Sequence, residues 1–229
     1  NFVLANTLYL GNDVSYTFGT LNIQNGGSMY LDSNYLDETG GTITVDILDI
    51  DSGGVLSATG LGYEAGDLDS DGVPAAGSSN TRSGGGGHGG RGGDSAVSYS
   101  STGGPTYGSA TAPVTLGSGS YRINGGSGGG AIKLNVTNNL VVNGEITSDG
   151  YHGSAGGSIW IVAKNYSGTS GLITANGGAC SYTNSTGSGG GGRIRIEYVN
   201  KTYSGTAPTA SFGTRSTVAN RGADGTVSE

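Results

Sequence analysis

Short apolar runs separated by turn signals recur along the chain, and this pattern is typical of β-strands rather than helices. Within each run, Ile, Val and Leu either alternate with polar residues or stand next to one another. The clearest runs cover residues 43–50, 132–136, 159–162 and 194–199. Three of them are followed by a second short run, Gly-x-(Leu/Ile)-(Ser/Thr)-(Ala/Ser)-x-Gly, at residues 54–60, 144–150 and 171–177. The chain therefore carries a weak internal repeat of two strands.

The spacing of this repeat predicts the fold. The second and third copies of the glycine-bounded motif begin at Gly144 and Gly171, 27 residues apart, which is a spacing typical of solenoids. We expect each strand to pair with its equivalent in the next coil, so that inward side chains stack. The predicted fold class is all-β, a parallel β-helix (β-solenoid) with a long glycine-rich insertion. Its core is expected to contain Ile43, Val45, Ile132, Leu134, Ile159, Ile161, Ile194 and Ile196.

Two segments are expected in this chain. Residues 1–41 would form N-terminal acidic strands that could cap the solenoid or be donated to a neighbour. Residues 42–229 would form the glycine-rich β-solenoid, with the insertion at about 73–130. By composition alone the insertion could be a flexible linker. Tyrosines and prolines punctuate it, however, and a pure spacer has no need of aromatic anchors, so we favour an ordered insertion.

Glycine accounts for 49 of the 229 residues, and this abundance argues against an ordinary helical fold. Collagen is excluded as well, because the glycines fall in clusters such as residues 84–87 and there are only four prolines. The single cysteine, Cys180, allows no internal disulfide, so stability must come from the sheet. No run of 18 apolar residues occurs, and we therefore expect no membrane span.

Charge is unevenly distributed along the chain. Residues 1–72 hold 11 acidic residues and no Lys or Arg, whereas residues 73–229 hold 10 basic and 6 acidic residues. The formal net charge is −7. With neither a basic stripe nor a recognition-helix pattern, the sequence argues against nucleic-acid binding.

Alternating carboxylates in residues 67–72 form the best candidate metal site. Asp67, Asp69 and Asp71 precede a turn glycine, and carboxylate oxygens in a tight loop are ligands that Ca²⁺ prefers. A complete EF-hand loop is excluded, because Ser78 stands where a bidentate glutamate is needed. The alternative is a solvated acidic turn without a metal.

Four N-glycosylation sequons would suit a secreted glycoprotein. They begin at Asn135, Asn165, Asn184 and Asn200. The many asparagine, serine and threonine residues of this chain produce about as many sequons by chance, so their number is not evidence of glycosylation.

Several glycine-rich motifs resemble a known type of protein. They lie at residues 57–63, 86–93, 104–109, 156–161 and 190–196. In this order they are similar to the glycine-rich parallel β-helix region of large secreted or surface-anchored adhesin-like microbial proteins, over about Thr42 to Phe212. The resemblance implies a right-handed β-helix located outside the cell or on its surface, and it carries over no catalytic residues.

The expected function is therefore that of an extracellular structural or adhesive module, a subunit of a surface fibre or filament. An open solenoid ends in unpaired backbone donors and acceptors, which must be capped or paired. We expect these ends to assemble head to tail with further copies of the chain, or to stack on neighbouring domains of a longer chain. The acidic N-terminal third and the net basic remainder would favour that polarity.

Two other functions stay open. Aromatic side chains stack on sugars, and the chain has 13 Tyr and one Trp, so a lectin-like carbohydrate-binding domain is the main alternative. A polysaccharide-degrading β-helix enzyme would need carboxylates beside Lys or Arg on neighbouring coils. Asp149, His152, Lys133 and Arg193 could meet in this way, but scattered charges on a solenoid are more often surface residues. We expect no enzymatic activity.

Overall fold

The computed structural model describes residues 1–11, 15–34, 38–64, 84–95, 101–120, 126–180, 187–214 and 221–229. Its secondary structure consists of strands, and no helix occurs in these ranges. The strands are β1 (Phe2–Leu4), β2 (Thr7–Leu10), β3 (Ser15–Ile23), β4 (Ser28–Leu31), β5 (Ser33–Asn34), β6 (Thr39–Ile50), β7 (Val55–Ser57), β8 (Ala131–Val142), β9 (Glu145–Thr147), β10 (Ser158–Ser167), β11 (Leu172–Thr174), β12 (Arg193–Lys201) and β13 (Thr226–Ser228). The all-β prediction is confirmed.

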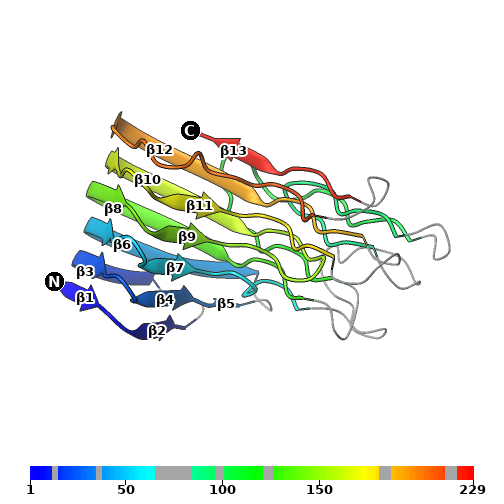
Figure 1. Ribbon diagram of the computed structural model, residues 1–229, viewed down its shortest axis with the longest axis horizontal. Coiled ribbons are helices and arrows are strands. Elements are labelled where there is room, and N and C mark those ends of the chain that lie inside the picture. Colours follow the sequence, from blue (N-terminus) through cyan, green and yellow to red (C-terminus); the bar gives the residue numbers. More distant parts are fainter. Residues whose placement is uncertain are drawn as a thin grey trace.

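The strands form two parallel sheets (Figure 1). The larger sheet has the order β1-β3-β6-β8-β10-β12-β13, and the smaller sheet has the order β11-β9-β7-β4-β2. Successive strands alternate between the two sheets, so a strand meets its parallel neighbour only after a stretch of chain in the other sheet. There are two exceptions among the described strands: β5 pairs antiparallel with β6, and β13 follows β12 within the larger sheet. The strands of residues 1–31 lie in the same two sheets as the later ones.

The repeat seen in the sequence forms neighbouring strands. The three glycine-bounded motifs contain β7, β9 and β11, which pair side by side with Leu56 opposite Ile146 and Ile146 opposite Ile173. The four long apolar runs lie in β6, β8, β10 and β12, which are adjacent in the larger sheet. Equivalent positions of the repeat therefore stack, as expected from the 27-residue spacing.

Strand β8 contains one residue more than its partners across the same stretch. Val136 pairs with Ala163 of β10, and Asn139 pairs with Asn165. The two β8 residues are three positions apart in the sequence, whereas the two β10 residues are two positions apart. The pairing of β6 with β8 shifts at the same level. An extra residue of this kind is a β-bulge, which bends a strand locally while pairing resumes on either side.

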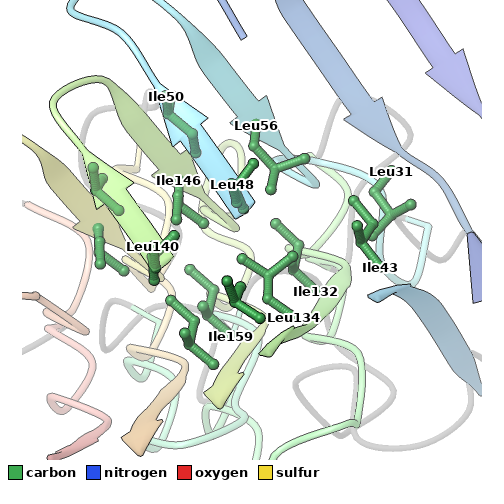
Figure 2. Packing of buried hydrophobic residues seen from close by; sticks show 14 of the residues in the cluster. Leu31, Ile43, Leu48, Ile50, Leu56, Ile132, Leu134, Leu140, Ile146 and Ile159 are labelled. Carbon is green, nitrogen blue, oxygen red and sulfur yellow. The ribbon is translucent and has the colours of Figure 1, made fainter. Parts of the chain in front are cut away.

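Inward-facing aliphatic side chains from both sheets form one continuous core (Figure 2). Ile43 and Leu134 of the larger sheet and Leu56 and Ile146 of the smaller sheet belong to this cluster and are fully buried. All eight residues predicted for the core are in it, each at most 1% exposed. Burying one such side chain stabilises a fold by about 1.5–3 kcal/mol relative to leaving it exposed.

Beyond the strands, extended glycine-rich segments run side by side, in the right half of Figure 1. We call this region the glycine lattice. It comprises residues 84–93, 103–104, 117–119, 126–130, 153–157, 175–178 and 187–192, joined by backbone hydrogen bonds. Several of these segments come from the stretch 73–130 that the sequence suggested as an insertion. Their described residues are tied by backbone hydrogen bonds to segments far along the chain, such as Gly90 to Gly191 at 2.8 Å.

The hydrogen bonds of the glycine lattice repeat every three residues. Amides of four consecutive residues donate to carbonyls of three different segments: Gly189 to Gly178, Gly190 to Gly86, Gly191 to Ala223 and Gly192 to Ala175. Gly189 and Gly192, three residues apart, both bond to segment 175–178. Segment 187–192 thus has a three-residue period, and none of these bonds joins two of its own residues. This pattern matches the polyproline II conformation, whose amides point outward in three directions. The lattice therefore differs from a pleated sheet, in which a strand bonds to two neighbours.

Only glycine permits the segments to lie this close together. A Cβ atom on Gly191 would lie 1.8 Å from the carbonyl oxygen of Ala210, and one on Gly187 would lie 1.8 Å from that of Gly93. Both distances are far below any van der Waals contact, so a side chain at either position would push two backbones apart. This crowding explains the high glycine content physically.

Candidate binding surface

Three adjacent strands place long polar or aromatic side chains in one row on the outer face of the larger sheet. In the pairing of β8, β10 and β12, Trp160 lies directly between Lys133 and Arg195. The residues preceding them, among them Ile132 and Ile159, are buried in the core. Because side chains alternate along a strand, the row Lys133–Trp160–Arg195 faces outward.

Trp160 holds its charged neighbours in place. The Lys133 Nζ atom lies 4.1 Å from the centroid of the indole ring, which is a cation–π contact. On the other side, the Trp160 Nε1–H donates to Glu197 Oε1 at 2.9 Å. Arg195 Nε donates to the same oxygen at 2.8 Å. Both hydrogen bonds lower the pKa of the Glu197 carboxyl, and the bond from Arg195 has the larger effect. The carboxyl therefore stays ionised.

A shallow cleft adjoins this row. Its volume is about 40 Å³, and its lining consists of Gly40, Gly41, Thr42, Pro113, Val114, Ala131, Ile132 and Lys133. Lys133 belongs to both the cleft and the row, and Thr42 of β6 pairs directly with Lys133. We call the set Thr42, Lys133, Trp160, Arg195 and Glu197 the tryptophan surface.

The tryptophan surface combines an ammonium group, a guanidinium group, a carboxylate, a hydroxyl and an aromatic ring. These groups are typical of sites that bind polar ligands through hydrogen bonds and a ring face or edge. The sequence interpretation considered Trp160 only as one aromatic residue among many. The outward positions of paired strands were the signal that could have found the cluster, but pairing Lys133 with Trp160 required the register.

A second polar cluster is buried inside the glycine lattice. His88 is fully buried. Burial, and to a smaller extent the nearby charge of Arg193, lowers the pKa of His88 to about 4, although two hydrogen bonds to backbone act in the opposite direction. Its ring lies 4.9 Å from that of Tyr107. Arg193 donates from Nε and Nη2 to the Tyr107 carbonyl at 2.9 and 2.7 Å. With these groups buried and bonded to backbone, the cluster ties segments together and offers a ligand little access.

Of the four residues considered for an enzymatic site, Asp149, Lys133 and Arg193 contact different partners. Asp149 accepts hydrogen bonds from Thr174 Oγ1 at 3.0 Å and from the Asn176 amide at 2.5 Å. Arg193 bonds to Tyr107 and Lys133 to Trp160, as described above, and His152 is exposed. None of these contacts joins a carboxylate to one of the cationic groups.

The predicted calcium ligands Asp67, Asp69 and Asp71 lie outside the described residues, so the calcium site stays a prediction. Within the ranges described, no group of three or more His, Cys, Asp or Glu side chains is placed to hold a metal ion. The sequon at Asn184 also falls outside the described residues.

The other three sequon asparagines lie on the larger sheet, and two of them belong to an asparagine ladder. Asn200 Nδ2 donates to Asn165 Oδ1 at 2.9 Å, and Asn165 Nδ2 donates to Asn139 Oδ1 at 2.8 Å. Asn135 makes only a long contact, 3.5 Å, to Thr44 Oγ1. Asn135 is therefore the one of the three whose side chain takes no part in the ladder.

No helix in the described part of the chain is both long and apolar enough to cross a membrane. Comparisons of the chain with protein-family models, curated proteins and solved structures gave no match.

Proposed function

We propose that this chain is a non-catalytic structural and adhesive module that acts outside the cell, with its strands wound as a right-handed β-solenoid. The regular alternation of strands between two parallel sheets supports the winding. Crossover connections between parallel strands of one sheet are almost always right-handed, and this general rule supports a right-handed solenoid. The solenoid belongs, in this proposal, to a surface fibre or filament.

The observation that carries the proposal is the open edge at each end of the larger sheet. Among the described strands, β1 pairs with β3 alone and β13 pairs with β12 alone. Both end strands run parallel to their neighbours, so β13 of one copy could add to β1 of the next without changing the strand direction. Unlike ends that meet in this way propagate as a filament. Neighbouring domains of a longer chain could continue the stack by the same contact.

Exposed apolar side chains at both ends favour such a contact. Val3 of β1 is 59% exposed, and Val227 of β13 is 43% exposed. Val199, at the edge of β12 beyond its pairing with β13, is 75% exposed. Charge also favours contact between unlike ends, because residues 1–72 are acidic and the remainder of the chain is net basic. Together these features favour a polar, head-to-tail stack.

Self-association is tested on the full chain by light scattering over a concentration series and by electron microscopy. We expect filaments, or a mass that grows with concentration. Val3→Lys places a charge at the β1 edge and should reduce association at least about tenfold. Val162→Lys, a matched change on the outer face away from both ends, should leave association unchanged. A strictly monomeric chain at every concentration, or equal effects of the two variants, would contradict the proposal.

A carbohydrate-binding module is the second candidate, and the tryptophan surface is the observation that favours it. A polysaccharide-degrading enzyme has less support, because the charged residues considered for it make separate contacts. Turnover of pectin-like or other polysaccharides by the purified chain would contradict the non-catalytic proposal.

The proposal also includes calcium bound at Asp67, Asp69 and Asp71 and glycans attached at the sequons. Calcium would add stability outside the cell, and the glycans would add solubility.

A further inference from the structure

Lys133 carries a charge that is held in position, and no ion pair with a described carboxylate neutralises it. Three ion pairs occur among the described residues, and they join Arg91 to Asp94, Arg195 to Glu197 and Lys201 to Glu229. Lys133 is in none of them, although the Trp160 ring fixes its ammonium group at 4.1 Å. A positioned cation without a carboxylate partner is suited to receive one from a ligand.

Glu197, two strands away on β12, supplies a complementary acceptor on the other side of Trp160 from this cation. Its hydrogen bonds from Trp160 and Arg195 both go to Oε1. Among the described residues, none donates to Oε2. With a lowered pKa, the carboxylate stays ionised, so Oε2 can accept hydrogen bonds from ligand hydroxyl groups.

The adjoining cleft limits the size of what can enter it. A volume of about 40 Å³ holds two or three water molecules, which is also the size of one small substituent of a larger ligand. Thr42 and Lys133 are the polar side chains of its lining. A ligand would therefore lie across the outer face of the sheet and insert one substituent between them.

We propose that the tryptophan surface binds a saccharide that bears a carboxylate group. Lys133 pairs with the ligand carboxylate, Glu197 Oε2 and the Thr42 hydroxyl bond to sugar hydroxyls, and Trp160 provides the apolar contact. A sulfate ion alone carries no hydrogen to donate to Glu197, and sulfate and phosphate ions would both be repelled by its negative charge. This inference rests on the adhesive part of the proposed function and names its ligand class.

The rigidity of the surface adds to this inference. Lys133, Trp160 and Arg195 stand on three strands paired in register, above fully buried isoleucines and leucines. The cation–π contact and the hydrogen bonds to Glu197 fix the side chains before a ligand arrives. Binding therefore requires little further ordering of the protein, which favours affinity for a small ligand.

The chain contains a single tryptophan, so tryptophan fluorescence reports on this surface directly. The full chain is titrated with carboxylated oligosaccharides (oligogalacturonate, a glucuronate-containing oligosaccharide and sialyllactose) and with neutral oligogalactose and lactose. We expect a saturable change with at least one carboxylated member, weakened by added salt, and an affinity for its neutral counterpart at least about tenfold lower.

Two variants of matched chemistry separate the site from general charge attraction. Lys133→Met keeps the length of the side chain and removes its charge, and it should weaken binding at least about tenfold. Lys164→Met removes the same charge from an exposed residue of β10 and should change affinity less than about twofold. Circular dichroism checks that both variants are folded.

The inference would be overturned by no saturable change with any carboxylated saccharide, by equal binding of the neutral saccharides, or by equal losses in the two lysine variants. Inorganic phosphate and sulfate that bind as tightly as the saccharides would also overturn it. Self-association of the chain is measured separately by light scattering. A chain that forms filaments but ignores these saccharides therefore loses this inference alone, and the proposed stacking stands.

Discussion

The Nδ1 atom of His88 lies 2.8 Å from the carbonyl oxygen of Gly156, which is 68 residues further along the chain. Because a carbonyl oxygen can only accept, Nδ1 must carry the proton in this bond. The Nε2 atom lies 2.8 Å from Thr115 Oγ1 and accepts from that hydroxyl when the ring is neutral. The neutral imidazole thus connects three segments of the glycine-rich region. A second proton, on Nε2, would reverse the direction of the bond to Thr115 and place a charge on a fully buried ring.

Acid is expected to destabilise the protein through His88. Burial lowers the pKa of this histidine to about 4 in the folded chain, from 6.5 in the unfolded chain. As the pH falls from 6.5 towards 4, the unfolded state gains a proton that the folded state does not, so the free energy of unfolding decreases. The loss should reach about 3 kcal/mol near pH 4. Denaturant unfolding near pH 7 and near pH 4 measures it.

His88→Gln tests this assignment, because other groups also titrate in the acid range. The variant should be less stable near neutral pH, but its stability should depend less on pH between 6.5 and 4 than that of the wild type. An unchanged slope in His88→Gln would show that carboxylates alone cause the acid sensitivity.

The close packing of the glycine lattice predicts a sharp contrast between two glycine substitutions. Gly191→Ala would place a Cβ atom 1.8 Å from the Ala210 carbonyl oxygen and should lower stability by about 2 kcal/mol or more. Gly19→Ala, in strand β3, meets no atom within 4 Å and should be neutral or slightly stabilising. Thermal unfolding of both variants measures the contrast. Similar melting temperatures would mean that the lattice is looser than its geometry indicates.

Neighbouring residues of β10 should respond oppositely to truncation. Ile161 faces the core and is fully buried, so Ile161→Ala should cost about 2–5 kcal/mol. Val162 faces outward and is 37% exposed, so Val162→Ala should change stability by no more than about 0.5 kcal/mol. Denaturant titrations give both values. Equal losses would contradict the inward and outward directions assigned to this strand.

The asparagine ladder should contribute to the stability of the larger sheet. Asn165→Ala removes one donor and one acceptor and should cost about 1–2 kcal/mol. Asn135→Ala removes only a long contact to Thr44 and should cost less than about 0.5 kcal/mol. Unfolding curves of the two variants are compared under identical conditions. If Asn135→Ala is the more harmful change, the ladder is not the source of the stability.

Calcium should stabilise the chain if the acidic turn binds it. Adding Ca²⁺ would then raise the melting temperature, EDTA would reverse the rise, and Asp69→Asn would abolish it by removing one ligand charge. Asp46→Asn is the matched control, because Asp46 lies on β6 and accepts a hydrogen bond from Thr137. A melting temperature that Ca²⁺ and EDTA leave unchanged would establish the solvated turn instead.

Local patterns determined much of the fold. Alternation in the run that begins at Ile43 and in the run that begins at Ile132 fixed which side chains point inward, because successive side chains of a strand face opposite sides. The 27-residue spacing of the motifs at Gly144 and Gly171 correctly indicated that equivalent strands pair. These signals lie within short windows of the chain, so the sequence alone contains them.

Other features depended on contacts between distant segments. The β8 bulge, the pairing of Trp160 with Lys133 and Arg195, and the bond from His88 to Gly156 follow from the register of strands and segments about 27 to 90 residues apart. By composition alone the glycine runs could have been a flexible linker, because a glycine sequence carries no side-chain pattern, and only the tyrosines and prolines among them favoured order. Only the tertiary arrangement, in which amides such as those of Gly90 and Gly190 meet carbonyls of other segments, decided that these runs form the lattice.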